Sequence, residues 1–487
     1  MIAILLNDNS YEQDIRELLM AFFPGETFSY QPDETARLTV TGTVSADERF
    51  FTLALEVPGG TAAACPKDAG EPLEVNYRDR FAAKNKIKRQ LYGLLKSYTG
   101  ISLPWGTLTG IRPTKIVMEK LAAGMPKEEI SSFMEDTYFT DPEKVSLCIE
   151  IAGYEQELLR TINCHKGYSL YLGIPFCPTT CLYCSFTSFP ISKWQDKTHL
   201  YLDALFQEME FVADQKRGTQ LDTVYIGGGT PTALTAADLD RLLGQLKTVF
   251  DLSRLREFTV EAGRPDSITR EKLQVMKRHG VTRISINPQT MQQKTLDLIG
   301  RRHTAAEVTA CFAMARELGF DNINMDLIIG LPEETPEDVA DTMAQIEKLK
   351  PDSITVHTLA VKRAARLNTM KEVCRDLNSG GISKSLKTTA AYARKMGMVP
   401  YYLYRQKNMA GNFENVGYAL PGKACIYNVL IMEEKQTILA CGAGTTTKIL
   451  YPEENRISRI ENVKSVEHYI GRIDEMIERK KKILSDY

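Results

Sequence analysis

Tyr171-Leu-Gly-Ile-Pro-Phe-Cys177-Pro-Thr-Thr-Cys181-Leu-Tyr-Cys184 carries three closely spaced thiols directly after an apolar run that predicts a strand. A loop with the spacing Cys-x3-Cys-x2-Cys can fold three sulfurs onto one metal centre. Thiolates are the ligands that iron–sulfur clusters require, and three of them leave one iron of a 4Fe-4S cluster open to another ligand. Zinc is the alternative, but a structural zinc site needs four ligands, and no fourth Cys or His lies close by in the sequence.

Around this stretch, short apolar runs alternate with helical patterns, which is typical of βα units and a parallel sheet. Six runs are predicted strands: 168–175, 223–227, 257–261, 283–288, 322–330 and 353–359. The helical stretches between them include 198–211 and 335–349, and the second opens with a capping signal at Thr335 and Asp338. The pattern therefore predicts an α/β fold built as a partial (β/α)6 barrel.

The regions on either side of the predicted barrel follow other patterns. The N-terminal region contains predicted strands at 1–6, 38–43 and 51–57 and a predicted helix at 11–22. A Gly/Pro/Ala-rich stretch at 58–72 then separates these elements from several helices within 79–159. After about residue 400 come an aromatic segment, a short apolar run that ends at Cys441, and a charged helix over 464–484. We therefore expect an N-terminal α+β module at 1–165, the barrel at 166–400 and a small C-terminal module at 401–487.

Length and charge exclude several classes of protein. The chain has 487 residues, of which 43% are hydrophobic and 25% charged, so it can bury a sizeable core. Sixty Lys and Arg oppose 62 Asp and Glu, which favours neither nucleic acid nor a membrane surface as a partner. The apolar start, 1–6, is too short for a secretory signal, and no membrane span is expected. The expected location is the cytoplasm.

Glycine and polar residues stand at the ends of the predicted strands. Gly227, Gly228, Gly229 and Thr230 form a run that permits close backbone approach, so it binds a small polar ligand or simply makes a tight turn. No Lys follows, which excludes a phosphate loop. Polar side chains inside buried strands need partners, so they face a ligand at the barrel mouth or make buried hydrogen bonds. These side chains are Glu261, Ser285, Asn287, Gln289 and Asp326.

Together these motifs resemble the radical S-adenosylmethionine (SAM) superfamily and, more narrowly, oxygen-independent coproporphyrinogen III oxidase and its relatives. The resemblance rests on the cysteine stretch, Gly-Gly-Gly-Thr-Pro, Glu-Ala-x-Arg-Pro-Asp (261–266), Arg-Ile-Ser-Ile-x-x-Gln and Asp-Leu-Ile-x-Gly-Leu-Pro. Three further stretches are similar to the HemZ-type coproporphyrinogen dehydrogenase branch. They are Leu-Pro-Trp105-Gly-Thr-Leu-Thr-Gly-Ile-Arg-Pro-Thr-Lys, Tyr401-Tyr-Leu-Tyr-Arg-Gln-Lys and Ala-Cys-Gly-Ala-Gly. The resemblance implies a 4Fe-4S cluster that cleaves SAM to a 5'-deoxyadenosyl radical, with a reduced flavodoxin or ferredoxin-type protein as electron donor.

The resemblance also assigns site residues. The implied cluster ligands are Cys177, Cys181 and Cys184. The implied SAM-binding residues are Tyr171, Gly227, Gly228, Gly229, Thr230, Glu261, Gln289, Arg301 and Asp326, with Arg302 as an adjacent competitor of Arg301. No catalytic residue beyond the cluster and SAM is implied.

A tetrapyrrole substrate with carboxylate side chains needs cationic and aromatic partners. An alternating stretch after residue 400 offers them: Tyr402, Tyr404, Arg405 and Lys407. The structural alternative is that these residues tie the C-terminal module to the barrel.

The implied reaction is the oxidative decarboxylation of coproporphyrinogen III propionates to vinyl groups, which gives protoporphyrinogen IX in haem biosynthesis. Two positions depart from the oxidase pattern: Phe186 replaces a fourth cysteine, and Gly173 replaces a His. Haem chaperones and haem-degrading methyltransferases share the Phe, so the alternatives are a chaperone that binds SAM and a cluster, or a radical SAM methyltransferase that opens haem.

Three weaker features remain. His303 and His357 are interpreted as satisfied structural histidines, with proton donors or haem ligands as the alternatives. The basic stretch 78–89 is interpreted as a solvated face, with substrate carboxylates or RNA as alternatives. The charges of Lys480, Lys481 and Lys482 are expected to be solvated.

Overall fold

The structure, a computed structural model, describes residues 1–57, 71–110, 112–185, 187–360, 379–406 and 412–484. The chain forms two compact units. The N-terminal unit comprises Met1–Ala152 and Tyr404–Glu414, and the barrel unit comprises Gly153–Leu403 and Asn415–Tyr487. The division falls within helix α5 (Pro142–Arg160). The boundaries at 165 and 400 expected from the sequence remain predictions about domains.

A small sheet forms the base of the N-terminal unit. Its strand order is β2 (Phe28–Ser29), β1 (Ile2–Leu6), β3 (Leu38–Val44), β4 (Phe50–Glu56) and β5 (Leu73–Glu74). Alternate residues of β3 and β4 are buried, as expected for a sheet with one covered face. Helices α1 (Glu12–Phe22) and α2 (Arg80–Thr99) pack on that face and supply most of the remaining core. Helices α3 (Thr114–Ala122) and α4 (Lys127–Tyr138) follow, and the predicted N-terminal strands and helix are confirmed.

Six parallel strands form the centre of an 11-stranded sheet in the barrel unit. They are neighbours in chain order: β6 (Gly167–Ile174), β9 (Gln220–Gly228), β10 (Glu257–Gly263), β11 (Arg283–Ile286), β12 (Ile323–Ile329) and β13 (Ser353–Thr358). Each coincides with one predicted apolar run. The continuous burial of these strands is typical of a parallel sheet covered on both faces. The predicted partial barrel is therefore confirmed.

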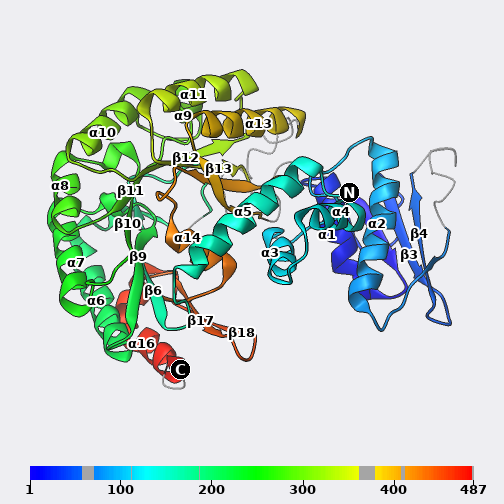
Figure 1. The fold of residues 1–487 in the computed structure, drawn as a ribbon, viewed down its shortest axis with the longest axis horizontal. Helices are drawn as coiled ribbons and strands as arrows, with labels where there is room; N and C mark the ends of the chain where they lie inside the picture. Colours follow the sequence, from blue (N-terminus) through cyan, green and yellow to red (C-terminus); the bar gives the residue numbers. More distant parts are fainter. Residues whose placement is uncertain (58–70, 111, 186, 361–378, 407–411, 485–487) are drawn as a thin grey trace. The chain divides into compact units, whose positions relative to one another are not determined.

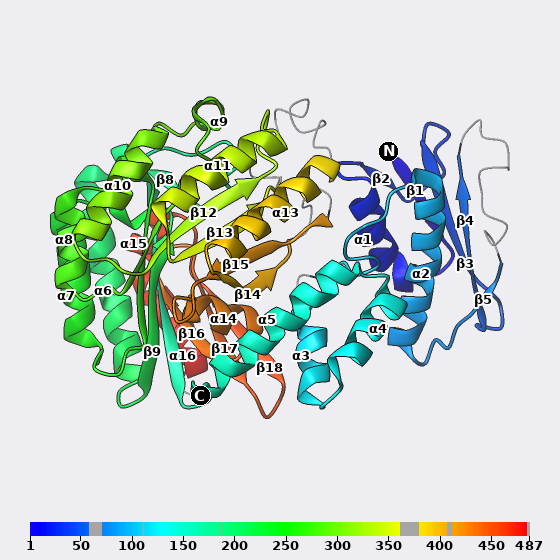
Figure 2. The ribbon, with the colours of Figure 1, turned by 45° about the horizontal axis from the view of Figure 1, so that its top comes forward.

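Helices follow the strands and line the outer face of the sheet (Figures 1 and 2). They are α6 (Thr198–Gln215), α7 (Ala236–Val249), α8 (Arg270–Arg278), α10 (Ala305–Glu317), α11 (Pro336–Leu349) and α13 (Ser379–Lys395). Helix α11 begins with a capping box in which the Thr335 and Asp338 side chains bind each other's backbone N–H, as the sequence predicts. None of the helices in the described ranges combines the length and apolarity needed to cross a membrane.

The residues after 400 extend both edges of the central sheet. On one edge, β15 (Asn415–Ala419) runs antiparallel to β13, with β14 (Val399–Tyr404) beyond it. On the other, β16 (Thr437–Cys441) runs parallel to β6, followed by β17 (Thr446–Tyr451) and β18 (Arg456–Glu461). Helix α14 (Ile426–Glu433) connects the two edges. The C-terminal segment thus completes the sheet that the six βα units begin.

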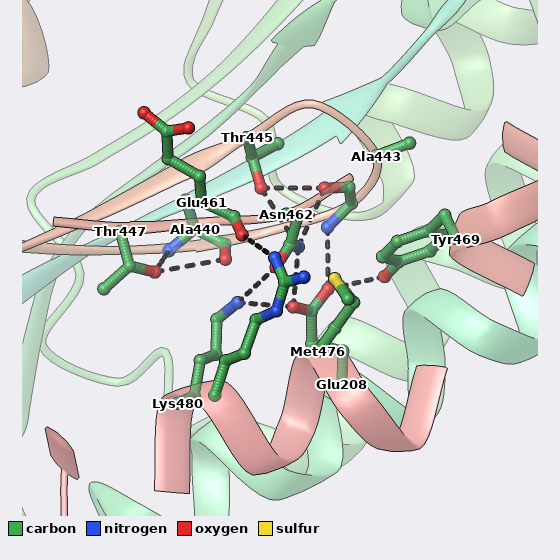
Figure 3. Close-up of polar contacts among 12 residues, drawn as sticks. Glu208, Ala440, Ala443, Thr445, Thr447, Glu461, Asn462, Tyr469, Met476 and Lys480 are labelled. Atoms are coloured by element: carbon green, nitrogen blue, oxygen red, sulfur yellow. Dashed lines mark hydrogen bonds and ion pairs between the residues drawn. The ribbon is translucent and has the colours of Figure 1, made fainter. Parts of the chain in front are cut away.

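The C-terminal helices are anchored by a buried ion pair. The predicted charged helix forms α15 (Val466–Gly471) and α16 (Ile473–Leu484). The side chains of Lys480 in α16 and Glu208 in α6 are both 0% exposed and bind each other, and Asn462 and Tyr469 also bind Glu208 (Figure 3). The expectation of a solvated Lys480 is wrong, because its ammonium reaches a buried carboxylate from an element 272 positions away in sequence. Lys481 is exposed, as expected.

Candidate active site

The three cysteines lie on one loop beyond the carboxyl end of β6. Cys177 ends the short strand β7 (Phe176–Cys177), which pairs with β8 (Phe189–Pro190) and so closes the base of the loop. Within the loop, the Cys184 N–H donates to the Cys181 carbonyl at 3.2 Å. The Leu182 N–H donates to the Ile299 carbonyl at 3.1 Å, which fixes the loop to the end of helix α9 (Gln293–Leu298).

The loop offers a partly shielded set of thiols. Cys181 is buried, whereas Cys177 and Cys184 are half-buried. In the described ranges, no three His, Cys, Asp or Glu side chains converge on a single-ion site. A 4Fe-4S cluster needs no such convergence, because each thiolate binds a different iron. Burial raises the pKa of Cys177 above its usual value, so its thiol is neutral until a metal displaces the proton.

The glycine run after β9 binds the backbone that leads into the cysteine loop. The N–H groups of Gly229 and Thr230 donate to the carbonyls of Ile174 and Phe176, both at 2.7 Å. A Cβ at position 229 would lie 2.5 Å from the Phe176 carbonyl oxygen, so only glycine fits there. The Thr230 hydroxyl lies 3.5 Å from the Cys177 sulfur. Close backbone approach therefore accounts for these glycines, and their contact with SAM remains a prediction.

Gln289 lies just past β11 in a conformation that side chains rarely adopt. Its φ is +68°, and its N–H and carbonyl pair with the backbone of Asp326 and Ile328 in β12 at 3.0 and 2.9 Å. Its side-chain Oε1 is buried and has no hydrogen-bond partner among the described residues. Backbone strain together with an unsatisfied buried acceptor is typical of a ligand-binding position. The residue therefore fits a bound polar cofactor.

Two carboxylates within β10 and β12 have different protonation preferences. Glu261 accepts a hydrogen bond from the Tyr225 hydroxyl at 2.6 Å, and burial raises the pKa of Glu261 to about 7. Asp326 accepts from the Asn324 amide at 2.7 Å and lies 3.9 Å from His357 Nε2. Burial opposes its ionisation, but these partners outweigh burial and hold the pKa of Asp326 below its usual value. The site thus contains one firmly anionic and one readily protonated carboxyl group.

Arg301, and not Arg302, belongs to the cysteine loop region. The Arg301 guanidinium is 6% exposed and donates to the Asn287 carbonyl at 2.7 Å and to the Tyr183 hydroxyl at 3.0 Å. Tyr183 stands just before the third cysteine and packs against an apolar cluster that includes Ile299. Arg302 is exposed. The Arg301 Nε has no partner within the described chain, so it remains available to an anionic group.

The two histidines differ in their surroundings. His303 is 0% exposed, and neither of its ring nitrogens has a hydrogen-bond partner in the described part of the chain. Burial lowers the pKa of His303 to about 4, so this imidazole is neutral. His357 is half-buried and lies beside Asp326. The expectation of a hydrogen-bonded structural His therefore does not hold for His303.

Sequence reasoning missed the role of Arg264. It lies just after β10, is 3% exposed, and binds both Asp266 and the loop between the first two cysteines. The signal that could have found it is an Arg at a strand end, two residues before an Asp. A second missed feature is a cluster of three nearly parallel tyrosine rings. The ring centroids of Tyr171 and Tyr225 lie 6.0 Å apart, those of Tyr171 and Tyr427 6.1 Å, and those of Tyr225 and Tyr427 4.6 Å. Tyr171, which is predicted to bind SAM, is thus part of an aromatic cluster.

The described members of the predicted substrate set are divided between the two units. Tyr402 is buried in β14 of the barrel unit, whereas Tyr404 and Arg405 belong to the N-terminal unit. Arg405 is 3% exposed, donates to the carbonyls of Leu108 and Gly110 at 2.8 and 3.2 Å, and lies over the Trp105 ring. These contacts favour a structural role for Arg405. Lys407 lies outside the described residues, and substrate binding by these residues remains a prediction.

Side chains of the basic stretch 78–89 make hydrogen bonds within the N-terminal unit. Arg80 donates to the Ser10 carbonyl at 3.0 Å, and Lys86 to the Glu74 carbonyl at 3.1 Å. Lys88 is buried, donates to the Thr109 hydroxyl at 2.9 Å, and has its pKa lowered to about 8 by burial. These contacts favour a structural role over binding of RNA or substrate.

One of the two departures from the oxidase pattern has a packing explanation. A Cβ at Gly173 would lie 2.5 Å from the Thr445 side chain, because β6 and the turn after β16 pack closely there. A histidine at position 173 would therefore require the Thr445 side chain to move. Phe186 lies outside the described residues.

Residues 171–346 match the family model of the Radical SAM superfamily. Three individual proteins are also similar to this chain. The oxygen-independent coproporphyrinogen-III oxidase-like protein HemZ of Bacillus subtilis is 37% identical over 484 residues, or 98% of this chain and 96% of that protein. The heme chaperone HemW of Bacillus subtilis is 38% identical over 195 residues, or 40% of this chain and 51% of HemW. The structure of the coproporphyrinogen III oxidase HemN from Escherichia coli matches with a TM-score of 0.52 and 24% identity, over 66% of this chain and 73% of that one.

Proposed function

The chain belongs to the radical SAM superfamily and, within it, to the family of the coproporphyrinogen-III oxidase-like protein HemZ, and on this premise we propose that it oxidatively decarboxylates coproporphyrinogen III. Its cofactors are a 4Fe-4S cluster and SAM. In the proposed reaction, a propionate side chain would lose carbon dioxide, one hydrogen atom to the radical that SAM supplies and one electron to a one-electron acceptor, and a vinyl group would remain. Two such reactions convert coproporphyrinogen III to protoporphyrinogen IX.

The observation that carries this proposal is similarity to HemZ along almost the whole chain, including the N-terminal unit. If the chain shared only cofactor binding with its relatives, sequence similarity limited to the barrel unit would be sufficient. Similarity that extends through both units supports a shared function more strongly than similarity of the cofactor-binding barrel alone would.

The cofactors fit the residues on the side of the sheet where the six parallel strands end. Cys177, Cys181 and Cys184 would hold the cluster, and the unpaired Gln289 oxygen and the Asp326 carboxylate would accept hydrogen bonds from SAM. When bound, the cluster and SAM supply the radical that removes a hydrogen atom from the substrate. The chain orients the reacting groups on rigid strand ends and excludes water from them. A reduced flavodoxin or ferredoxin-type protein is the proposed electron donor.

Turnover of coproporphyrinogen III tests the proposal directly. The purified protein, reconstituted with iron and sulfide under anaerobic conditions, is incubated with SAM, a reductant and coproporphyrinogen III. We expect monovinyl and divinyl products together with 5'-deoxyadenosine, measured by chromatography and mass spectrometry. The Cys181→Ala protein is the control and should give none of these products. Absence of vinyl products from the intact protein would contradict the proposal.

A haem chaperone is the second candidate. It is favoured by 38% identity to the heme chaperone HemW over 195 residues and by Phe186, which stands where the oxidase pattern has a cysteine. This candidate predicts stoichiometric haem binding without vinyl products. Spectrophotometric haem titration of the same preparation separates the two functions. The methyltransferase alternative rests on Phe186 alone and predicts methyl transfer from SAM and opening of the haem ring.

A further inference from the structure

Arg264 joins the end of β10 to the loop that carries the first two cysteines. Its Nε and Nη2 donate to the two carboxylate oxygens of Asp266 at 2.9 and 2.7 Å. Its Nη1 turns away from this pair and donates to the Thr179 carbonyl and hydroxyl at 3.0 and 2.8 Å. The same Nη1 lies 3.6 Å from the Cys181 sulfur. One buried guanidinium therefore contacts both the loop and a cluster ligand.

We infer that Arg264 is a positioning residue that sets the reduction potential of the cluster. It fixes the loop between Cys177 and Cys181 and holds a permanent positive charge beside the Cys181 thiolate. The inference rests on a cluster bound by the three cysteines, and it does not depend on the tetrapyrrole substrate.

The direction of the effect follows from charge. Reduction adds one electron to a cluster whose thiolate ligands are already anionic, so a nearby cation stabilises the reduced form. Net charge, hydrogen bonds to sulfur and solvent exposure are the factors that set such potentials. Arg264 contributes to all three, because it is 3% exposed, charged, and within hydrogen-bonding reach of sulfur. Asp266 acts in the opposite direction, since its carboxylate offsets part of the arginine charge.

A second feature separates this arrangement from an ordinary surface ion pair. Arg270 and Glu317 form an equally well-aligned bidentate pair at 3.0 and 2.6 Å, but their side chains are 48% and 64% exposed. Solvent screens charges at such a site. The Arg264 side chain is 4% exposed, so its field reaches Cys181 with little screening.

The test is a redox titration of the reconstituted full-length protein, followed by electron paramagnetic resonance in the absence of tetrapyrrole. Arg264→Met should lower the reduction equilibrium constant at least tenfold, a shift of about 59 mV to more negative potential for one electron. Asp266→Asn should shift the potential in the positive direction. Arg264→Lys keeps the charge and should stay within a factor of ten of the unmodified protein. Arg270→Met is the matched control and should not shift.

Iron content distinguishes an electrostatic role from a purely structural one. An unchanged potential in Arg264→Met with full iron content would overturn the inference. A negative shift or no shift in Asp266→Asn would also overturn it. If Arg264→Met retains no iron, the Asp266→Asn protein decides the question, with a positive shift in support. Because no tetrapyrrole is present, failure of the decarboxylation assay leaves this outcome unaffected.

Discussion

Gln289 combines a left-handed backbone with a buried amide oxygen that has no hydrogen-bond partner in the described chain. Each of these features costs on the order of 1–3 kcal/mol in the protein alone. A ligand that donates a hydrogen bond to Oε1 would recover the second cost. The residue is held in place by two backbone hydrogen bonds to β12, so the acceptor is already positioned before the ligand binds.

Removal of this acceptor should weaken SAM binding without loss of the cluster. We expect Gln289→Ala to reduce the free energy of SAM binding by about 1–3 kcal/mol. Equilibrium dialysis or calorimetry measures the affinity, and iron analysis checks the cluster. Gln289→Gly removes the same amide while it relieves the backbone strain, so it should give the same loss. Gln293→Ala, at an exposed glutamine of α9, is the control. Unchanged SAM affinity in both Gln289 variants would contradict the predicted pocket.

Glu261 should make stability depend on pH in a defined window. The pKa of Glu261 is about 7 in the folded protein, against a usual value of 4.5, because burial disfavours the carboxylate. Between these values the unfolded chain has released the proton and the folded chain has kept it, so a rise in pH favours unfolding. Glu261→Gln has no proton to lose at this position.

We therefore expect the unmodified protein to lose stability relative to Glu261→Gln as the pH rises from 4.5 to about 7, with no further change above. Urea unfolding followed by circular dichroism, at steps of half a pH unit, measures the difference. A difference that stays constant over this range would show that the carboxyl group ionises normally.

The residues that sequence patterns could identify are those with local signals. The cysteine spacing and the glycine run are contiguous, and each polar strand end follows a recognisable apolar run. Arg264 carries only the weak local signal of an Arg two residues before an Asp at a strand end, and Lys480 carries none, because they bind partners 85 and 272 positions away. The alternating stretch around Arg405 was interpreted as a source of substrate contacts, but the Arg405 side chain binds backbone carbonyls of residues 108 and 110.

Among the elements, the contact between the ends of β6 and β9 positions the cysteine loop. The glycine run has no side chains, so the two backbones approach closely enough for the Gly229 and Thr230 N–H groups to bind β6 and β7. This contact holds the segment that enters the loop against the edge of the sheet. The local fold therefore couples the predicted SAM-binding loop to the cluster loop.

A methyl group at position 229 should disrupt this coupling. Its Cβ would lie 2.5 Å from the Phe176 carbonyl, so Gly229→Ala must displace backbone. We expect a large loss of bound iron after reconstitution, while the far-ultraviolet circular dichroism of the chain persists. Gly244→Ala, within α7, is the matched control, because its Cβ meets nothing closer than 3.9 Å. Normal iron content in Gly229→Ala would show that the close approach is not required.

The six central strands were predictable because each is an apolar run bounded by turn residues. The flanking strands were harder to predict. β18 has one buried residue among its six, and its strand character depends on pairing with β17. Pairing partners that are distant in the chain leave no local signal, so tertiary context decides these elements.

At the scale of the whole molecule, the buried Glu208 carboxylate joins three parts of the barrel unit. It accepts hydrogen bonds from Lys480 of α16, from the Asn462 side chain and from the Gly442 N–H after β16. The turn at Gly442 packs in turn against Gly173, at the end of β6. The C-terminal helix is thereby linked to the strand that leads to the cysteines.

Loss of the lysine should destabilise the barrel unit strongly. Lys480→Met leaves a buried carboxylate without its cation, which typically costs about 3–5 kcal/mol. Thermal unfolding followed by circular dichroism should show a clear fall in the midpoint. The double variant Lys480→Met with Glu208→Gln removes the unpaired charge and should recover part of the loss. Lys481→Met, at an exposed neighbour, should change little. Equal stability of Lys480→Met and Lys481→Met would contradict this account.

The place of β16 beside β6 has a consequence during translation. About 270 residues separate Gly167, the first residue of β6, from Thr437, the first residue of β16. At a synthesis rate of about 5–20 residues per second, the ribosome needs roughly 14 to 54 seconds to deliver the second strand after the first. For that interval, one backbone edge of the strand that leads to Cys177 has no partner from β16. Nascent chains thus carry an open β edge next to the cysteines until β16, which ends at Cys441, has been synthesised.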